Sequence, residues 1–242
     1  NRIWIYGPDV TGGTPTAIFD PAATGFTKAI FATGYVQIGL KDIKVQNYNS
    51  SEIPAMDFVS FCDVWCINIH ITNADIGVRF MNWTKYRWDG GRIDTCVQYG
   101  VHELFGVVRD FKSGNSTSSR PIITTCAQGV KAKELCTGHL DYVEVTDCTE
   151  GVVLVRDCTA NMTSAKILRN GVGTNLRSGS HAVVLSVDWG FGTANANTIP
   201  FDVDATSSFV VNENLPVSTK WTGKGERILG SFTPNGGFGY SA

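Results

Sequence analysis

Residues 83–103 combine aromatic, cationic and acidic side chains more densely than any other window of the chain. A sugar ring presents an apolar C–H face and a rim of hydroxyls. A glycan site therefore needs exposed aromatic rings with carboxylates, Arg, Asn or His around them. On this basis the window predicts a carbohydrate-binding site. Its candidate contact residues are Trp83, Tyr86, Arg87, Trp88, Arg92, Tyr99 and His102.

Three carboxylates of this window are candidates for catalysis. Asp89 and Asp94 lie on either side of Gly90-Gly91, so a tight turn can bring them to the separation that glycoside hydrolysis requires. Glu103 follows in aromatic surroundings that suit a general acid. The competing interpretation is structural. Asp89-Gly90 is then an ordinary turn dipeptide, Asp94 caps a turn, and the aromatic rings pack between coils or between subunits.

Metal and cofactor chemistry find little support in the sequence. Of the seven cysteines, Cys62 and Cys66 are spaced C-x3-C and Cys148 and Cys158 are ten apart, and neither is a zinc spacing. Most cysteines lie beside alternating apolar residues, which predicts small buried thiols, with a disulfide as the alternative. We therefore predict neither a metal nor a cofactor. Reduced cysteines fit a protein that folds in a cytoplasm.

Charge and hydropathy exclude further classes of partner. The formal net charge is −2 without a run of five like charges, so the basic face of a nucleic-acid-binding protein is not expected. Apolar runs are too short for a membrane span. The chain opens with NRIWIYG, which already alternates like a strand and carries neither an initiator Met nor a signal peptide. We expect the sequence to be a piece of a longer chain.

The composition and an internal repeat predict the elements that must position these residues. Val, Ile and Thr are abundant, Leu and Glu are scarce, and 26 glycines supply turns, which is typical of an all-β protein. Residues 69–80 align with 143–154 at an offset of 74 residues, and both read apolar-x-apolar-Thr-Asn/Asp-x3-Gly-Val-x-apolar. Shorter matches to this pattern occur at 43–47, 93–96, 167–170 and 184–188. They indicate repeating units of roughly 25 residues, which favours a parallel solenoid.

The strings IHITNADIGVRF (69–80), GVRFMNWT (77–84) and GVVLVRDCT (151–159) resemble coils of the pectate-lyase-like superfamily. Within it, the chain is most similar to bacteriophage tailspike or tail-fibre proteins. The expected fold is an all-β, single-stranded right-handed parallel β-helix. Residues 1–34 would form an entry coil, 35–190 the β-helix with a surface loop at 112–120, and 191–242 a C-terminal cap or trimerisation segment.

The resemblance implies a homotrimer on a virion tail, in contact with other tail proteins, folded in the host cytoplasm and acting outside the cell. It would recognise a bacterial surface polysaccharide, either capsule or O-antigen. It would also depolymerise that polysaccharide, either with a pair of Asp or Glu residues in a hydrolase or with a base and a neutralising cation in a lyase. The alternative is a non-enzymatic trimeric module that is structural or binds a receptor.

The chain departs from the superfamily where catalysis is concerned. The polygalacturonase motifs Asn-Thr-Asp, Asp-Asp, Gly-His-Gly and Arg-Ile-Lys do not occur, and TGHLD at 137–141 does not replace them. Activity on plant pectin is therefore not expected, and no catalytic residue can be transferred by motif. A secreted lyase is disfavoured for the same reason and by the missing signal peptide.

Overall fold

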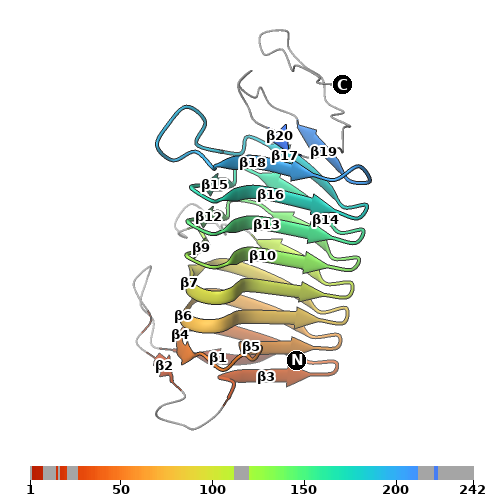
Figure 1. Ribbon diagram of the computed structural model, residues 1–242. Helices are drawn as coiled ribbons and strands as arrows, with labels where there is room; N and C mark the ends of the chain where they lie inside the picture. The colour runs from red at the N-terminus through yellow and green to blue at the C-terminus, as the bar shows by residue number, and fades with distance from the viewer. Residues whose placement is uncertain are drawn as a thin grey trace.

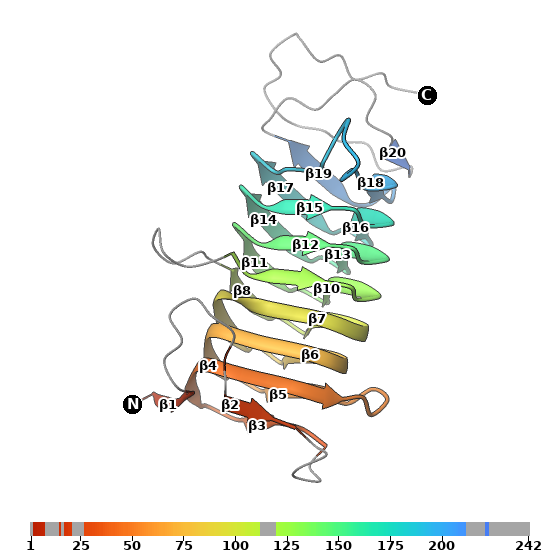
Figure 2. The ribbon, with the colours of Figure 1, turned by 90° about the vertical axis from the view of Figure 1, so that its left-hand side faces the viewer.

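The computed structural model describes residues 2–7, 15, 17–20, 27–111, 120–211 and 221–222. These residues form twenty strands in one sheet and no helix, and every pairing between strands is parallel. The sheet winds into a solenoid of about eight turns whose coils stack along one axis (Figures 1 and 2). The predicted all-β class and the parallel β-helix are confirmed, while the right-handed sense of the coil stays a prediction.

Each regular coil has three faces, which we call A, B and C in chain order. The long strands β4 (Gln37–Tyr48), β6 (Asp63–Met81) and β7 (Lys85–Leu104) bend around corners and contribute to more than one face. The other strands of face A are β1 (Ile3–Tyr6), β8 (Val108–Phe111), β11 (Thr137–Leu140), β14 (Thr159–Thr163), β17 (His181–Leu185) and β19 (Ser208–Val211). Face B adds β2 (Ala17–Phe19), β9 (Ile122–Thr124), β12 (Glu144–Thr146) and β15 (Lys166–Leu168). Face C adds β3 (Ile30–Thr33), β5 (Pro54–Val59), β10 (Gln128–Lys133), β13 (Glu150–Val155), β16 (Val172–Arg177), β18 (Ile199–Val203) and β20 (Trp221–Thr222).

The sequence repeat corresponds to the stacking register. Ile71 pairs with Ile93, Ile93 with Ile123, and Ile123 with Val145, so the 74-residue offset spans three coils. The regular coil is shorter than expected, because residues in register there, such as Thr137 and Thr159, are 22 apart. Other coils carry insertions at their corners. The segment 112–119 of the expected surface loop lies outside the described residues.

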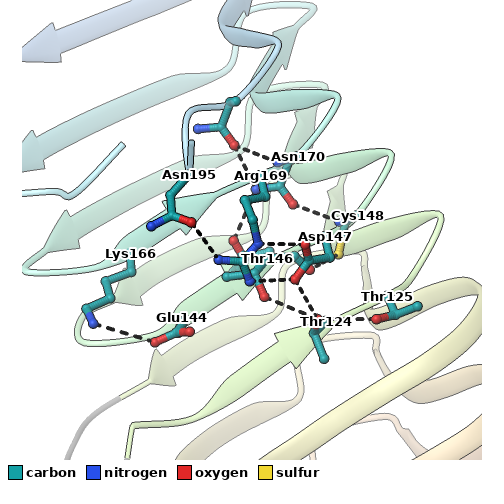
Figure 3. Close-up of polar contacts among 12 residues, drawn as sticks. Thr124, Thr125, Glu144, Thr146, Asp147, Cys148, Lys166, Arg169, Asn170 and Asn195 are labelled. Atoms are coloured by element: carbon teal, nitrogen blue, oxygen red, sulfur yellow. Dashed lines mark hydrogen bonds and ion pairs between the residues drawn. The ribbon is translucent and has the colours of Figure 1, made fainter. Parts of the chain in front are cut away.

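The corners are made by residues with left-handed backbone conformations. Between faces B and C these include Asn47, Asn73 and Asp147, with φ of 66°, 54° and 56°, a conformation that Asn and Asp adopt more readily than most residues. Figure 3 shows the corner at Asp147, whose carboxylate accepts two hydrogen bonds of 2.7 Å from Arg169 of the next coil. On the outer side of this corner, side-chain hydrogen bonds thus join neighbouring coils in addition to the backbone hydrogen bonds.

Small polar side chains and thiols form two columns inside the solenoid, one at the corner between faces C and A and one at the corner between faces B and C. Cys136 Sγ donates to the carbonyl of Lys133 at 3.3 Å, and Ser180 Oγ donates to the carbonyl of Arg177 at 2.8 Å two coils later. At the other corner Cys148 is followed in the next coil by Asn170, whose side chain accepts a hydrogen bond from the Cys148 amide (Figure 3). All seven cysteines are buried and free, which confirms the prediction of buried thiols.

The strand stack continues beyond residue 190. Strands β18 and β19 pair in parallel with β16 and β17, and β20 pairs with β18. At the other end, β1 and β2 pair in parallel with β4. Residues 212–220 and 223–242 of the expected cap lie outside the described residues.

Candidate functional site

The window 83–103 is distributed around an entire coil, because β7 passes over all three faces. Arg87 and Asp89 point outward from face A. Arg92 and Asp94 point outward from face B, and Tyr99 and His102 lie half-buried on face C. Proximity in sequence therefore does not produce one site here.

Asp89 and Asp94 lie on opposite sides of the bend at Gly90-Gly91, where φ is 64° and 82°. Asp89 accepts a hydrogen bond of 2.9 Å from Arg87, and Asp94 accepts one of 2.8 Å from Arg92. The bend directs the two carboxylates to different faces instead of bringing them together. The structure thus places each of them beside an arginine of its own strand.

Tyr86, Trp88 and Glu103 belong to the core, because they occupy inward positions of β7. Glu103 is completely buried, where it accepts hydrogen bonds from Arg109 Nε at 2.9 and 3.0 Å and from the Tyr86 hydroxyl at 2.6 Å. Burial opposes the charge of Arg109, but the Glu103 carboxylate outweighs this and raises the pKa of Arg109. In this arrangement the three side chains do not reach the surface, where a polysaccharide would bind.

Trp83 is the exposed one among the aromatic candidates. This residue is 58% exposed and lies at the corner between faces C and A. On consecutive coils this corner carries a strip of exposed apolar side chains, which we call the aromatic ridge. It consists of Tyr35, Phe61, Trp83, Phe105 and Leu135.

The ridge follows from the backbone of the corner. Its two central residues have positive φ, as at Asn82 and Trp83 with 53° and 64°, and backbone hydrogen bonds join this corner to its neighbours. Successive coils are about 4.8 Å apart, so Tyr35, Phe61 and Trp83, which hold the second corner position, follow one another along the solenoid axis. Leu135 holds the same position two coils beyond Trp83. The coil between them has Gly106 there, and Phe105 holds the neighbouring first position. Tyr35 and Phe61 stack with ring centroids 4.9 Å apart.

A groove of about 420 Å3 opens along the ridge between Trp83 and Leu135. Gly106 forms part of it, with φ of 73°, and the Trp83 ring would have to shift to admit a larger residue, because a Cβ atom would lie 2.6 Å from it. Polar groups on the rim are Glu134, Arg156 and Asp157, of which Arg156 and Glu134 form an ion pair at 2.5 Å. The groove therefore combines an aromatic platform with two carboxylates and a guanidinium, as sugar recognition requires.

Face C carries a polar row beside the ridge. Arg79 pairs in register with His102, and His102 with Lys131, so their outward side chains follow one another on three coils. The sequence contains a signal for this row. Each of the three residues follows a Gly-Val pair, at Gly77-Val78, Gly100-Val101 and Gly129-Val130. Aligning these pairs would have grouped Arg79 and Lys131 with His102, the one member of the row among the predicted residues.

His102, the middle residue of this row, has a strongly lowered pKa. Burial, together with the positive charges of Arg79, Lys131 and Lys133, lowers the pKa of His102 to about 4. Its imidazole is therefore neutral at neutral pH, and the Tyr99 ring lies 4.3 Å from it. The Nδ1 atom of His102 is buried and has no hydrogen-bond partner among the described residues.

A second group of aromatic rings lies on face A near the N-terminus. Trp4 contacts Tyr6 and Trp65 with centroid distances of 5.5 and 6.1 Å. The guanidinium of Arg2 covers the Trp65 ring at 3.9 Å and pairs with Asp63 at 2.8 Å. Because the protein's own arginine occupies the Trp65 face, this group is a weaker candidate for sugar stacking than the ridge.

In the part of the chain that the structure describes, no three His, Cys, Asp or Glu side chains are grouped to hold a metal ion. The same residues include no helix that could cross a membrane. The chain matches no family model, no curated protein and no solved structure. What it shares with the pectate-lyase-like superfamily is thus the parallel β-solenoid architecture.

Proposed function

We propose that the protein recognises and depolymerises a bacterial surface polysaccharide, capsule or O-antigen, as the β-helix of a phage tailspike or tail fibre. The observation that carries this proposal is the groove beside the exposed Trp83. A linear polymer lying along the solenoid axis would cross successive coils and meet one ridge side chain on each. Trp83 would stack on a sugar ring, while Glu134, Arg156 and Asp157 would bind hydroxyls.

The same groove supports a hydrolytic reaction better than the carboxylates of the 83–103 window do. Glycoside hydrolysis needs two carboxyl groups on either side of the scissile bond. Glu134 and Asp157 line one groove, whereas Asp89 and Asp94 point from two faces and Glu103 is buried. We assign the acid and base roles within the groove to Glu134 and Asp157.

The test is a screen of the protein against a panel of bacterial capsules and O-antigens, with binding and release of reducing ends as separate readouts. Trp83→Ala should weaken binding roughly tenfold, because one aromatic contact is lost, and should leave the thermal midpoint unchanged. Glu134→Gln and Asp157→Asn should abolish cleavage but retain binding. The matched control is Tyr142→Ala, which removes an exposed ring at another corner.

A polysaccharide that is cleaved at the wild-type rate by the Glu134 and Asp157 variants would refute the catalytic assignment. If Trp83→Ala and Tyr142→Ala bind equally well, the groove is not the binding site. Products with an absorbing double bond would show a lyase reaction instead of hydrolysis.

One observation favours the non-enzymatic alternative. The aromatic ridge exposes one large apolar side chain on each of five consecutive coils, and such surfaces also form contacts between subunits. A trimeric module would bury the ridge, so native mass measurement of Phe61→Ser and Leu135→Ser separates the two functions. Loss of the oligomer with no effect on glycan binding would support the structural module.

A further inference from the structure

The polar row of face C presents a positive charge that the described residues only partly neutralise. Arg79 donates hydrogen bonds of 3.0 and 2.8 Å to the buried carboxylate of Asp57, which also pairs with Lys28. Lys131, two coils further on, forms no ion pair with any described residue. Lys133 lies on the same strand, next to the corner with the ridge, where it forms a half-exposed ion pair of 3.5 Å with Glu134. The positive charge is therefore concentrated at the Lys131 end of the row.

Glu150 is the carboxylate that acts most strongly on Lys131, and it is already hydrogen-bonded to other residues. It pairs in register with Gln128, one coil away, and accepts hydrogen bonds from the side chains of Gln128 and Asn175. Burial lowers the pKa of Lys131, Glu150 counteracts this, and Lys133 lowers it further. For Lys131 the attraction of Glu150 outweighs the repulsion of Lys133, but Glu150 hydrogen-bonds to Gln128 and Asn175 and forms no ion pair with Lys131 among the described residues.

The neighbours of Lys131 indicate what kind of ligand this surface accepts. A cation would be repelled by Arg79, Lys131 and Lys133. A neutral sugar would leave the charge of Lys131 unpaired at a half-buried position, which is unfavourable. A carboxylate or phosphate would accept hydrogen bonds from the ammonium groups, and bonds between charged partners are the stronger ones. His102, neutral and in tilted contact with the Tyr99 ring, would flank such an anion without repelling it.

We propose that Lys131 and Lys133 bind an anionic substituent, carboxylate or phosphate, of the polysaccharide that lies on the aromatic ridge. This inference rests on the proposed function, because it specifies the chemical class of the glycan at the same surface. Lys133 is one residue before Glu134, which lines the groove, so one polymer can contact both. Negatively charged repeating units are then selected over neutral ones.

The experiment uses the full chain and pairs of polysaccharides that differ only in charge. Acidic capsules are compared with their carboxyl-reduced forms, and phosphate-bearing ones with their dephosphorylated forms, by calorimetric titration. The wild type should bind the anionic member of a pair at least about tenfold more tightly, and added salt should weaken this binding. The carboxylate and phosphate pairs distinguish the two sources of negative charge.

The variant for this test is Lys131→Gln combined with Lys133→Gln. It should lose roughly tenfold or more in affinity for the anionic form and nothing for the neutral form. Lys44→Gln, the same change on the outward side of face B, is the matched control. Equal affinity of the wild type for both members of every pair would overturn this inference but not the proposed function. Absence of binding to any glycan would overturn both.

Discussion

At the scale of single residues, the buried triad of Glu103, Arg109 and Tyr86 shows how position within a coil decides the role of a side chain. Glu103 is the one carboxylate of the 83–103 window that lies in the core, where Arg109 and the Tyr86 hydroxyl satisfy it. Arg109 also donates to the carbonyl of Thr159 at 2.8 Å. The triad therefore joins neighbouring coils from within.

Glu103→Gln should lower the free energy of unfolding by about 3–5 kcal/mol, because it leaves the Arg109 charge buried without its partner. Replacing both residues together, as Glu103→Met with Arg109→Met, should cost less than either single change. Urea denaturation measures all three variants. A Glu103→Gln variant that is as stable as the wild type but inactive on the polysaccharide would instead identify Glu103 as catalytic.

At the scale of the strand and corner, the two columns of thiols and hydroxyls explain the unusual number of cysteines. Six of the seven lie just after a corner, where Cys62, Cys96, Cys126, Cys136, Cys148 and Cys158 donate to corner carbonyls. Thr84 and Ser180 donate in the same way within one of these columns. A small side chain with one donor is what the position requires.

Cys136→Ser should therefore change the free energy of unfolding by less than about 1 kcal/mol, because the hydroxyl replaces the thiol as donor. Cys66→Ser is the matched control, since Cys66 is fully buried on face A and its sulfur makes no hydrogen bond to a described residue. There the hydroxyl should destabilise the protein by about 1–3 kcal/mol. Equal losses for the two substitutions in chemical denaturation would contradict the donor role of the corner cysteines.

At the scale of the whole molecule, the solenoid is held together by contacts between neighbouring coils. Strands β6 and β7 pair with each other over their whole length and with a further coil on the other side. Coils near the ends, such as those with β3 and β19, have fewer described partners. In such a stack, stability is approximately a sum of terms between nearest neighbours.

Amide hydrogen exchange should therefore be slowest in β6, β7, β10 and β13 and at least about tenfold faster in β3, β18 and β19. Mass spectrometry of peptides from the full chain measures this profile. Protection that is uniform from β3 to β19 would show that the described coils unfold as one cooperative unit.

The architecture could be read from the sequence because it depends on local patterns that recur. The alternation of Ile and Val, the Asn or Asp at the corner and the Gly-Val pair each report on a single coil, and their repetition predicts the stack. The 22-residue length of the regular coil could not be predicted from the sequence. Insertions at the corners lengthen other coils, so the number of residues between in-register positions differs from coil to coil.

The location of the candidate site could not be read in the same way. The sequence by itself determined that the chain forms an all-β parallel solenoid built from repeated units of strands. Only the tertiary structure decided which face each side chain occupies and which residues of other coils lie beside it. The physical reason is that neighbours on a solenoid surface come from successive coils, about 4.8 Å apart in space but 22 or more residues apart in sequence.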